Sequence, residues 1–512
     1  MWQGQPFLRI AIPFIAGIGA GSAFAEKLDA YVLLCVCGAV LSLLFFLRKE
    51  KDGEHSPWFG IGACLLSFCI GMTLYTRQHQ NIESGARLLT THCQGTLQAK
   101  PENKQHSYAL RIRQHDGTEV ILYVGKSKNH SSDSVSLSSL NIGDTIYAAV
   151  SHLNITNKDT SAFQAYNSHL FRNGICATAY VKSNGWRAKR RSADASPQIN
   201  ISELSHSLQE TLHHIYDQQG INGDAGAVIE AMTIGRKSSL SQDVRSSYAS
   251  SGVSHVLAMS GFHIAIILTL LQFILFSKVI PLRWRWTTNM VIIPILWCFT
   301  FVAGTPPSLV RASTMCSLLL ICHSFTHQLL SVNSIAITLV FMLCCNPMHI
   351  LNAGMQLSFI SVTAIALMAK ELSSLCKVKN MIIQYIWQLI VVSFVCSLAT
   401  APLVAYHFGS ISLLSIAANL AVTLFVTAII IGCAAWWATL WLPSVNAPLT
   451  DFILWCASTT NAITEQMASL PYSTLHWRPN LPLVFLYHLI LLSLIYAIHT
   501  SRKNTEKGIR TM

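Results

Sequence analysis

The sequence predicts a polytopic α-helical membrane protein of about eleven transmembrane or re-entrant helices, with a small OB-like β-barrel domain inserted among them. The membrane class follows from composition. Of the 512 residues, 52% are hydrophobic and 11% are charged, whereas soluble domains contain about 25% charged residues. The inserted domain follows from a polar stretch between the first apolar segments and the later ones, which has the alternating pattern of β-strands.

The positive charge of the chain is concentrated in this polar stretch. The net charge is +12, and residues 77–200 alone carry fifteen basic and eight acidic residues. A surface that binds a polyanion needs an excess of this kind. The alternative is a basic domain that is simply soluble, and composition alone leaves both interpretations open.

The N-terminal transmembrane domain, residues 1–76, contains three apolar segments that are long enough to cross a bilayer. They are Phe7–Phe24, Tyr31–Leu47 and Trp58–Tyr75. The loop 48–51 is basic, so the positive-inside rule predicts that this loop and the N-terminus are cytoplasmic and that the polar stretch is extracytoplasmic. Gly17, Gly19 and Gly21 predict close helix packing in the first segment.

Residues 88–188 are predicted to form the OB-like extracytoplasmic domain. Apolar and more polar residues alternate over 108–113, which is the period of a half-buried strand. Strands are expected at Gln94–Ala99, 108–113, Val120–Val124, Asp144–Leu153 and Gly174–Lys182, with a short helix at Ala162–Phe171. Five short strands in about one hundred residues suit a small barrel of the OB type.

The predicted barrel carries candidates for binding single-stranded nucleic acid, which OB barrels bind through basic grooves and stacked aromatic rings. The candidates are Arg111, Arg113, Lys126, Lys128, Tyr108 and Tyr166, with Tyr123 and Phe171 as further aromatic residues. The alternative is that the aromatic side chains form the barrel core. A basic run at 187–191 closes the domain and is a candidate for contact with lipid headgroups or phosphates.

Cysteine usage bears on the compartment of this domain. Thirteen of the fifteen cysteines lie in or beside apolar segments, and only Cys93 and Cys176 lie in the polar stretch, near its first and last predicted strands. If the domain faces an oxidising compartment, a disulfide between these two residues is a reasonable hypothesis. No Cys/His array has the spacing of a zinc site, so we expect neither a metal nor another cofactor.

Residues 200–251 are predicted to form amphipathic surface helices. A helix at Ile201–Gln219 has apolar residues on one face, and a polar helical run follows at Ala225–Ser251. His206, His213 and His214 are expected to be surface residues rather than metal ligands.

A second transmembrane domain is predicted over residues 252–500. It begins with Gly252–Ile280, which is long enough to span a bilayer. Polar residues and a glycine gather near its start, at Ser254, His255, Ser260, Gly261 and His263. Each polar group in lipid must find a partner or water inside the protein, so we expect a broken membrane helix here. The alternative is an ordinary membrane helix with small packing residues.

The remaining apolar segments bring the number of spans to about eleven. They are Asn289–Ala303, Leu309–Phe325, Val332–Cys345, Gly354–Ala369, Met381–Tyr406, Leu420–Leu442 and Leu481–His499. Lys370, Lys377 and Lys379 predict a cytoplasmic loop, and Asn446–Leu470 is expected along the membrane interface. The basic tail, residues 501–512, favours a cytoplasmic C-terminus. An odd number of spans from a cytoplasmic N-terminus would place the C-terminus outside, so the sequence leaves the location of the C-terminus undecided.

Several later segments contain helix breakers and polar residues where lipid-buried helix would be expected. Non-helical backbone at membrane depth is tolerated only around a cavity or within protein, and helix N-termini suit phosphate. Arg311 in an apolar helix costs roughly 2.5–3.5 kcal/mol on insertion scales, so we expect it to face water or a partner. The residues predicted to line or gate a hydrophilic path are Ser260, Gly261, His263, Arg311, Gln356 and Asn419. The alternative is that Arg311 snorkels to the membrane surface and the others are packing contacts.

Four stretches resemble, in the same order, sequence blocks of the ComEC family of competence proteins. They are AMTIGRKSSLSQDVRSSYASSGVSHVLAMSGFHIAI (Ala231–Ile266), GTPPSLVRAS (Gly304–Ser313), NPMHILNAGMQLSFIS (Asn346–Ser361) and TAPLVAYHFGSISLLSIAANL (Thr400–Leu420). The polar stretch is similar to the OB-type domain of that family, as far as AFQAYNSHLFRNGI (Ala162–Ile175). The resemblance implies an inner-membrane channel that takes single-stranded DNA into the cytoplasm during natural transformation. It also implies an external DNA receptor, a cytoplasmic ATPase and strand-binding proteins as partners.

The sequence also departs from the family. Many members carry a C-terminal metallo-β-lactamase-like domain, proposed as a nuclease, and this sequence contains no HxHxDH run. We therefore expect a short form without that domain and do not carry nuclease activity over. The sequence also lacks a Walker A motif and an HExxH motif, which argues against two further classes of enzyme. Ser260 followed by His263 is only a weak signal of a hydrolase. We expect no enzyme. The main alternative is a transporter of ions or small anionic solutes with a structural barrel, and a non-conducting assembly or receptor protein is a third.

Overall fold

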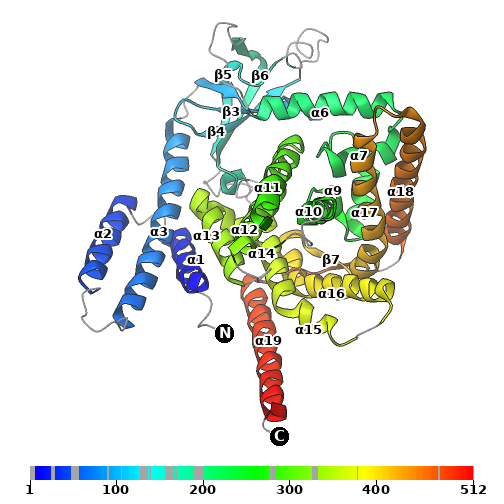
Figure 1. Ribbon diagram of the computed structural model, residues 1–512. Coiled ribbons are helices and arrows are strands. Elements are labelled where there is room, and N and C mark those ends of the chain that lie inside the picture. The colour runs from blue at the N-terminus through cyan, green and yellow to red at the C-terminus, as the bar shows by residue number, and fades with distance from the viewer. Residues whose placement is uncertain are drawn as a thin grey trace. The chain divides into compact units, whose positions relative to one another are not determined.

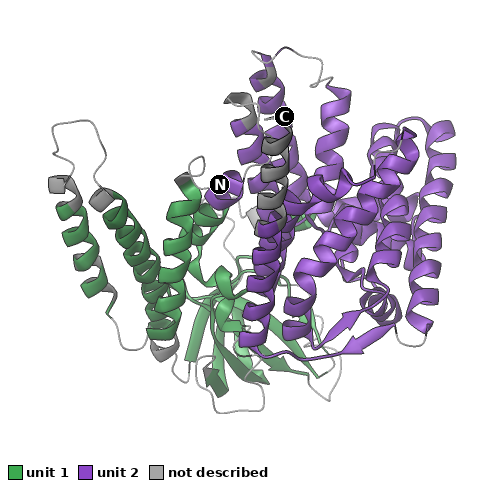
Figure 2. Cartoon of the chain, turned by 90° about the horizontal axis from the view of Figure 1, so that it is seen from below, with its two compact units in different colours: residues 1–207, 339–352 green, residues 208–338, 353–512 purple. Residues whose placement is uncertain are grey.

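The structure is a computed structural model of the 512-residue chain. It describes residues 6–24, 29–47, 57–88, 92–104, 106–126, 137, 140–155, 167, 170–189, 201–275, 281, 284–325, 332–376, 379–470 and 473–510. The chain divides into two compact units, coloured green and purple in Figure 2. Unit 1 comprises residues 1–207 and 339–352, and unit 2 comprises residues 208–338 and 353–512.

Three helices of unit 1 correspond to the three predicted N-terminal segments. They are α1 (Pro6–Phe24), α2 (Ala30–Leu47) and α3 (Pro57–Leu88), labelled in Figure 1. Helix α3 continues past the predicted end at Tyr75, and its Gly85 lies directly against Thr118 of the β domain. The same helix therefore carries the chain from an apolar segment to the β domain.

Helices α1 and α3 approach each other at glycines. A Cβ atom at Gly17 would collide with the backbone of Phe68, and one at Gly21 would press against the backbone of Met72. Small residues of this kind allow two helix backbones to come close together. The predicted close packing is confirmed for Gly17 and Gly21, whereas Gly19 has open space around its Cα and does not take part.

The β domain of unit 1 contains the five predicted strands and one short additional strand. They are β1 (His92–Leu97), β2 (Glu102–Asn103), β3 (Ser107–Arg113), β4 (Glu119–Gly125), β5 (Thr145–Ile155) and β6 (Ile175–Lys189). The strand order is β1-β5-β6-β4-β3-β2, and β1 also pairs with β3. That extra pairing closes five strands into a ring, in which β4 and β6 are parallel and the other pairs are antiparallel.

The interior of the ring follows from the alternation of side chains along each strand. Leu110 and Ile112 of β3 are fully buried, while Arg111 and Arg113 between them point outward and are exposed. Leu122 of β4 is fully buried as well. The strand pattern predicted over 108–113 is therefore confirmed.

Helices form most of unit 2. The helices from residue 201 onward are α6 (Ile201–Gln218), α7 (Gly223–Thr233), α8 (Gln242–Ser250), α9 (Ser254–Leu257), α10 (Gly261–Ile274), α11 (Arg285–Val302), α12 (Pro307–Phe325), α13 (Val332–Cys345), α14 (Ala353–Ala364), α15 (Lys370–Ser373), α16 (Met381–Phe408), α17 (Ser415–Ala438), α18 (Pro443–Ser469) and α19 (Leu481–Arg510). Helices α6 and α13 cross the boundaries between the units. A 3₁₀-helix, η2 (Pro347–Leu351), follows α13, and a π-helix, η3 (Ile365–Ala369), follows α14.

Several of these helices match the predicted spans. Among the described residues, 5 helices are long and apolar enough to cross a membrane, and 3 of these lie in unit 2, at Ala353–Ser373, Met381–Phe408 and Ser415–Ala438. Shorter apolar helices occupy the other predicted segments from residue 261 onward. The membrane class is thus supported by long apolar helices, while a total of about eleven spans stays a prediction.

Helix α7 lies inside unit 2, and the prediction that residues 200–251 form surface helices is wrong for this part. Residues Gly226–Met232 are all buried, in one hydrophobic cluster with Tyr216 of α6 and Trp436 of α17. Most side chains of this segment are apolar, which suits a core, and its one carboxylate, Glu230, lies against polar groups of His213 and Ser239. His213, also predicted at the surface, is partly buried, and its Nδ1 lies 2.6 Å from a carboxylate oxygen of the buried Glu230.

We predict that Gly17→Leu destabilises the packing of α1 on α3, whereas Gly19→Leu leaves it intact. Overpacking of this kind costs about 1–3 kcal/mol, because the new side chain at residue 17 has no space beside Phe68. The measurement is the temperature at which each purified variant loses its monodisperse gel-filtration peak in detergent. Equal loss of stability in both variants would show that α1 and α3 do not pack through Gly17.

Candidate functional site

The predicted broken helix is present in the described part of its segment, residues 252–275. The short helix α9 ends at Leu257, Ala258 and Ser260 have extended backbone, and α10 begins at Gly261. The chain therefore restarts a helix beside the polar residues that the sequence singled out. The N–H groups of the first turn of such a helix have no intrahelical partners, and they give its start a partial positive charge.

The structure also interrupts its helices at other places where the sequence predicted breaks. Helices α11 and α12 are joined by a tight turn in which Gly304 and Thr305 have positive φ angles of 83° and 51°. Helix α16 ends at Gly409, also with positive φ, and the chain then forms β7 (Ser410–Ser412), which pairs with β8 (Thr474–His476). This two-stranded ribbon satisfies backbone groups that helices would otherwise have satisfied.

Three of these interruptions meet inside unit 2. The hydroxyl of Ser308, in the first turn of α12, donates a 2.5 Å hydrogen bond to the carbonyl oxygen of Met259, just before α10. Gly252 lies so close to Ser412 that a Cβ atom there would collide with its side chain. The segment that leads into α10, from Gly252 to Met259, therefore contacts both the start of α12 and the ribbon after α16.

His263 and Ser260 cap the first turn of α10. The backbone N–H of Ser260 donates to Nδ1 of His263 at 3.3 Å, and the Ser260 hydroxyl accepts from the backbone N–H of Phe262. Because Nδ1 is an acceptor here, the neutral imidazole carries its proton on Nε2. The His263 side chain is completely buried, and Nε2 has no hydrogen-bond partner among the described residues.

The same contacts bear on the hydrolase alternative. Ser260 Oγ lies 3.2 Å from Nδ1 of His263, which resembles a nucleophile beside a base. The lone pair of Nδ1 is already engaged by the backbone N–H of Ser260, however. A nitrogen in that state is poorly placed to take the hydroxyl proton, so the pair is better explained as a helix cap.

Arg311 lies one turn after Ser308 on α12 and is 8% exposed. Its Nη2 donates to Ser358 Oγ on α14 at 3.4 Å, and its Nε is buried without a hydrogen-bond partner among the described residues. Two residues earlier on α14, Gln356 Oε1 lies 2.8 Å from Nε2 of His407 on α16. Separate hydrogen bonds thus place polar side chains at the start of α10, on α12, on α14 and on α16, and we name this set of residues the polar chain.

The structure brings most of the predicted path residues into this polar chain. Ser260, His263, Arg311 and Gln356 belong to it, whereas a Cβ atom at Gly261 would lie at an ordinary contact distance of 3.6 Å from the side chain of Ala312, so the packing there does not require glycine. Asn419 on α17 does not belong to it, because no hydrogen bond joins its side chain to another described residue. Residues that the sequence marked only as polar near breaks turn out to be partners in the chain, namely Ser308, Ser358 and His407.

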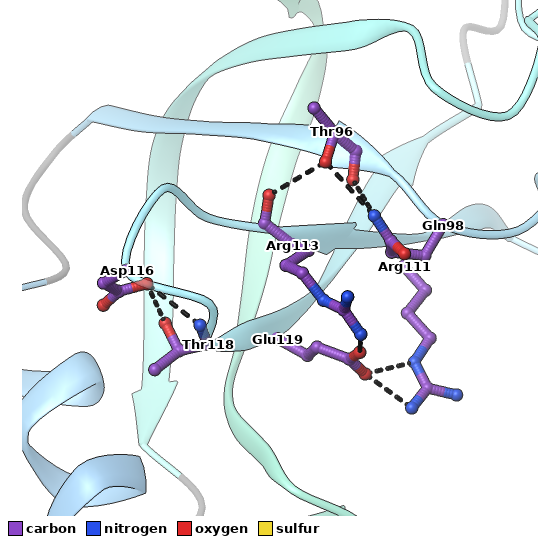
Figure 3. A network of polar contacts seen from close by, with 7 residues as sticks. All are labelled: Thr96, Gln98, Arg111, Arg113, Asp116, Thr118 and Glu119. Carbon is purple, nitrogen blue, oxygen red and sulfur yellow. Dashed lines mark hydrogen bonds and ion pairs between the residues drawn. The ribbon is translucent and has the colours of Figure 1, made fainter. Parts of the chain in front are cut away.

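The β domain holds a second set of predicted site residues. Arg111 and Arg113 both pair with Glu119 on the neighbouring strand, with N–O distances of 2.5 and 2.8 Å (Figure 3). Asp116 accepts from the backbone and hydroxyl of Thr118 and so shapes the turn that leads into Glu119. The two arginines remain about half exposed, but Glu119 reduces their combined charge to +1.

Aromatic side chains and lysines meet on the same domain. The rings of Tyr123 and Tyr180 stack with centroids 5.2 Å apart, and His152 stacks on the other side of Tyr180 at 6.3 Å. The ammonium of Lys104 lies 5.2 Å from the Tyr123 ring, and Lys126 lies 5.3 Å from the Tyr108 ring. Of these residues, the sequence analysis missed Tyr180, His152 and Lys104.

The other residues that the sequence predicted to bind DNA are either only partly exposed or lie outside the described residues. Tyr108 lies on the same strand row as the buried Leu110, at the end of the ring, and is only partly exposed. Lys128 and Tyr166, also predicted as DNA-binding residues, lie outside the described residues. Tyr180 escaped prediction because its partner Tyr123 is distant in sequence, and only the parallel pairing of β4 and β6 sets them opposite each other.

Cys93 and Cys176 are buried free thiols in the structure, so the predicted disulfide is not present in it. Gln114 Nε2 donates to Cys93 Sγ at 3.4 Å, and Cys176 Sγ donates to the carbonyl of Glu119 at 3.3 Å. Burial raises the pKa of Cys93, and it raises the pKa of Cys176 to about 11. Each thiol is therefore satisfied as a neutral donor or acceptor at neutral pH.

The long apolar helices and the folded β domain between them define a polytopic helical membrane protein. The model of the Competence protein family matches residues 232–501, more than half of the chain, and the chain therefore belongs to this family. It is also 26% identical over 519 aligned residues to ComE operon protein 3 of Bacillus subtilis (strain 168). That alignment covers 96% of this chain and 60% of the relative, so the chain spans about three fifths of the relative's length. No solved structure matches the chain.

We predict that iodoacetamide labels the exposed Cys376 at pH 8 but leaves Cys93 and Cys176 unmodified in the folded protein. A raised pKa keeps the thiolate fraction small below that pKa, so labelling of Cys176 will increase only as the pH approaches about 11. Peptide mass spectrometry after a timed pulse measures each site. Labelling of all three residues at similar rates would contradict the burial of the pair, and labelling that requires a reductant would reveal the disulfide.

Proposed function

We propose that this protein is a channel, not an enzyme, that moves single-stranded DNA through the inner membrane into the cytoplasm during natural transformation. The observation that carries the proposal lies in the polar chain, inside the family segment. Two buried donor groups, Nε2 of His263 and Nε of Arg311, have no hydrogen-bond partner there. A buried donor without a partner costs about 1–3 kcal/mol, and a passing phosphate would satisfy it.

The β domain supports a nucleic acid as the substrate. We take its closed ring of five strands, with one parallel pair, to be an OB-type barrel. The ring of Tyr180 is 49% exposed and stacks on the buried Tyr123, with Lys104 nearby, and exposed rings of this kind are the means by which such barrels hold unpaired bases. Bases in a duplex are already stacked on each other, so this surface favours a single strand.

The proposed orientation follows the charge of the loops. The N-terminus lies in the cytoplasm and the barrel lies outside, because the basic loop at 48–51 favours the inner side. An external DNA receptor would deliver the DNA to the barrel. A cytoplasmic ATPase and strand-binding proteins would draw the strand inward, since the chain has no nucleotide-binding motif of its own.

We predict that Arg311→Ala and His263→Ala each lower DNA uptake about tenfold or more. Each variant removes a donor whose charge-assisted or buried hydrogen bond to phosphate is worth about 1.5–3 kcal/mol. The measurement is the transformation frequency of a competent host in which the variant replaces the native protein. Immunoblots of membrane fractions establish that each variant is inserted at the normal level.

Thr314→Ser is the matched control on α12, because the hydroxyl of Thr314 bonds only to the carbonyl of Val310 in its own helix. This control is expected to transform normally. Normal transformation by both Arg311→Ala and His263→Ala would remove these residues from the path and support the packing interpretation. Uptake of chloride or phosphate by proteoliposomes, without DNA uptake, would favour a transporter of small anions.

We also predict that the purified protein prefers single-stranded over double-stranded DNA and that its affinity falls steeply as salt rises. Tyr180→Ala is expected to weaken binding by about 1–3 kcal/mol, the usual effect of losing one stacking ring. Glu119→Gln is expected to strengthen binding and to steepen the slope of log affinity against log salt by about 0.7, because it frees one positive charge. Fluorescence anisotropy with labelled oligonucleotides measures both.

Glu102→Gln is the control for Glu119→Gln, since both variants remove one carboxylate from the β domain. Glu102 is exposed on β2 and pairs with Ala109 of β3. A larger effect of Glu119→Gln than of Glu102→Gln would assign the gain to Arg111 and Arg113. The absence of DNA binding at low salt would leave the barrel with a structural role and would count against the channel for DNA.

A further inference from the structure

A large bulge interrupts the pairing of β5 and β6. Ala148 pairs with Trp186, and the next aligned pair is Val150 with Val181. Residues 182–185 of β6 therefore stand opposite the single residue Ala149 of β5. Bulges of this kind bend a strand, aim its side chains in new directions, and are common beside binding sites.

The bulge opens a hollow of about 580 Å³ on the outside of the β domain. This volume lies within the range of ligand sites, about 300–1,000 Å³. Strands β1, β5 and β6 line the hollow, and its wall contains aromatic, amide and basic side chains. The residues that matter for recognition are His92, Gln94, Tyr147, Asn184, Trp186 and Arg187.

The aromatic side chains of the hollow are partly exposed to solvent, and a hydrogen bond restrains one of them. Tyr147 is 41% exposed, and Trp186 is partly exposed. Gln94 Nε2 donates to the hydroxyl of Tyr147 at 3.3 Å, which restrains the tyrosine ring. Arg187 is exposed and, unlike Arg111 and Arg113, makes no ion pair with a described carboxylate. The hollow thus offers two ring faces and a cation with its full charge.

We infer that this hollow binds one unstacked base of a single-stranded nucleic acid. Tyr147 and Trp186 stack on the base, Arg187 contacts an adjacent phosphate, and the amides of Gln94 and Asn184 contact the base edge. Ring faces, amide groups and a cation together match a nucleotide better than any apolar ligand. The inference rests on the proposed function, because it takes the strand that the protein handles to be single-stranded DNA.

The hollow is separate from the row of stacked rings at Tyr123 and Tyr180. Tyr147 in the hollow and His152 in that row are five residues apart on β5, which is roughly 17 Å along an extended strand. A barrel of this type covers about 4–16 nucleotides. One strand of DNA can therefore occupy both places, with the bulge between them.

The test is photo-crosslinking of the full-length protein in detergent to an oligothymidylate that carries one 5-iodo-2′-deoxyuridine. Irradiation joins this base to an aromatic ring that lies against it, and peptide mass spectrometry identifies the ring. Crosslinks to Tyr147 or Trp186 are expected, and they are expected to disappear when an abasic nucleotide replaces the iodinated one. Crosslinks confined to other peptides would overturn the inference.

Variants make the same test quantitative. Trp186→Leu is expected to weaken oligothymidylate binding about tenfold, while Trp186→Phe, which keeps an aromatic ring, is expected to retain most of the affinity. Normal binding by Trp186→Leu and Tyr147→Ala, combined with weaker binding by Tyr180→Ala, would overturn the hollow as a base site but leave the proposed function standing. No binding of single-stranded DNA by the unaltered protein would overturn both.

Discussion

Every interruption of a helix inside an apolar layer creates polar groups that only other parts of the protein can satisfy, and unit 2 is organised around this constraint. At the start of α10, the caps from Ser260 and His263 satisfy backbone N–H groups. The carbonyl of Met259 is satisfied by Ser308 of a different helix. Because the break before α10 takes a partner from the start of α12, these two breaks lie together, and polar side chains follow on α12, α14 and α16.

Some of the polar side chains near these breaks keep a buried atom without a hydrogen-bond partner among the described residues. His263 and Arg311 keep such buried donor atoms, and the hydroxyl of Ser412 in the nearby ribbon is in the same state. A protein core built only for stability would pair or replace such groups. Under the proposed function, such donors would gain a partner only when an anionic substrate is present.

A different constraint applies to the β domain, because the positive charges of Arg111 and Arg113 are partly neutralised. Glu119 holds Arg111 and Arg113 together and limits their attraction for phosphate. In the proposed function, binding of a strand would then depend on the exposed ring of Tyr180, which stacks on the buried Tyr123, as well as on charge.

Local pattern by itself determined a large part of this protein. The apolar composition predicted the membrane helices, the alternation over 108–113 predicted a strand, and glycine and proline predicted the breaks near Gly261 and Pro307. These features follow from interactions within one or two turns of chain, so sequence displays them directly. The four predicted path residues that lie in the polar chain were singled out because polar residues in an apolar segment are conspicuous, and their role in a path stays a prediction.

The tertiary structure alone decided which distant groups meet. Burial of α7 depends on packing with Tyr216 and Trp436, which a helical pattern cannot show. The pairing of Arg111 with Glu119, and of Tyr123 with Tyr180, depends on strand register. The partners of Arg311 and Gln356 lie on other helices. Contacts between residues far apart in the chain leave no periodic trace in the sequence, and they arise only when the whole fold fixes its helices and strands in space.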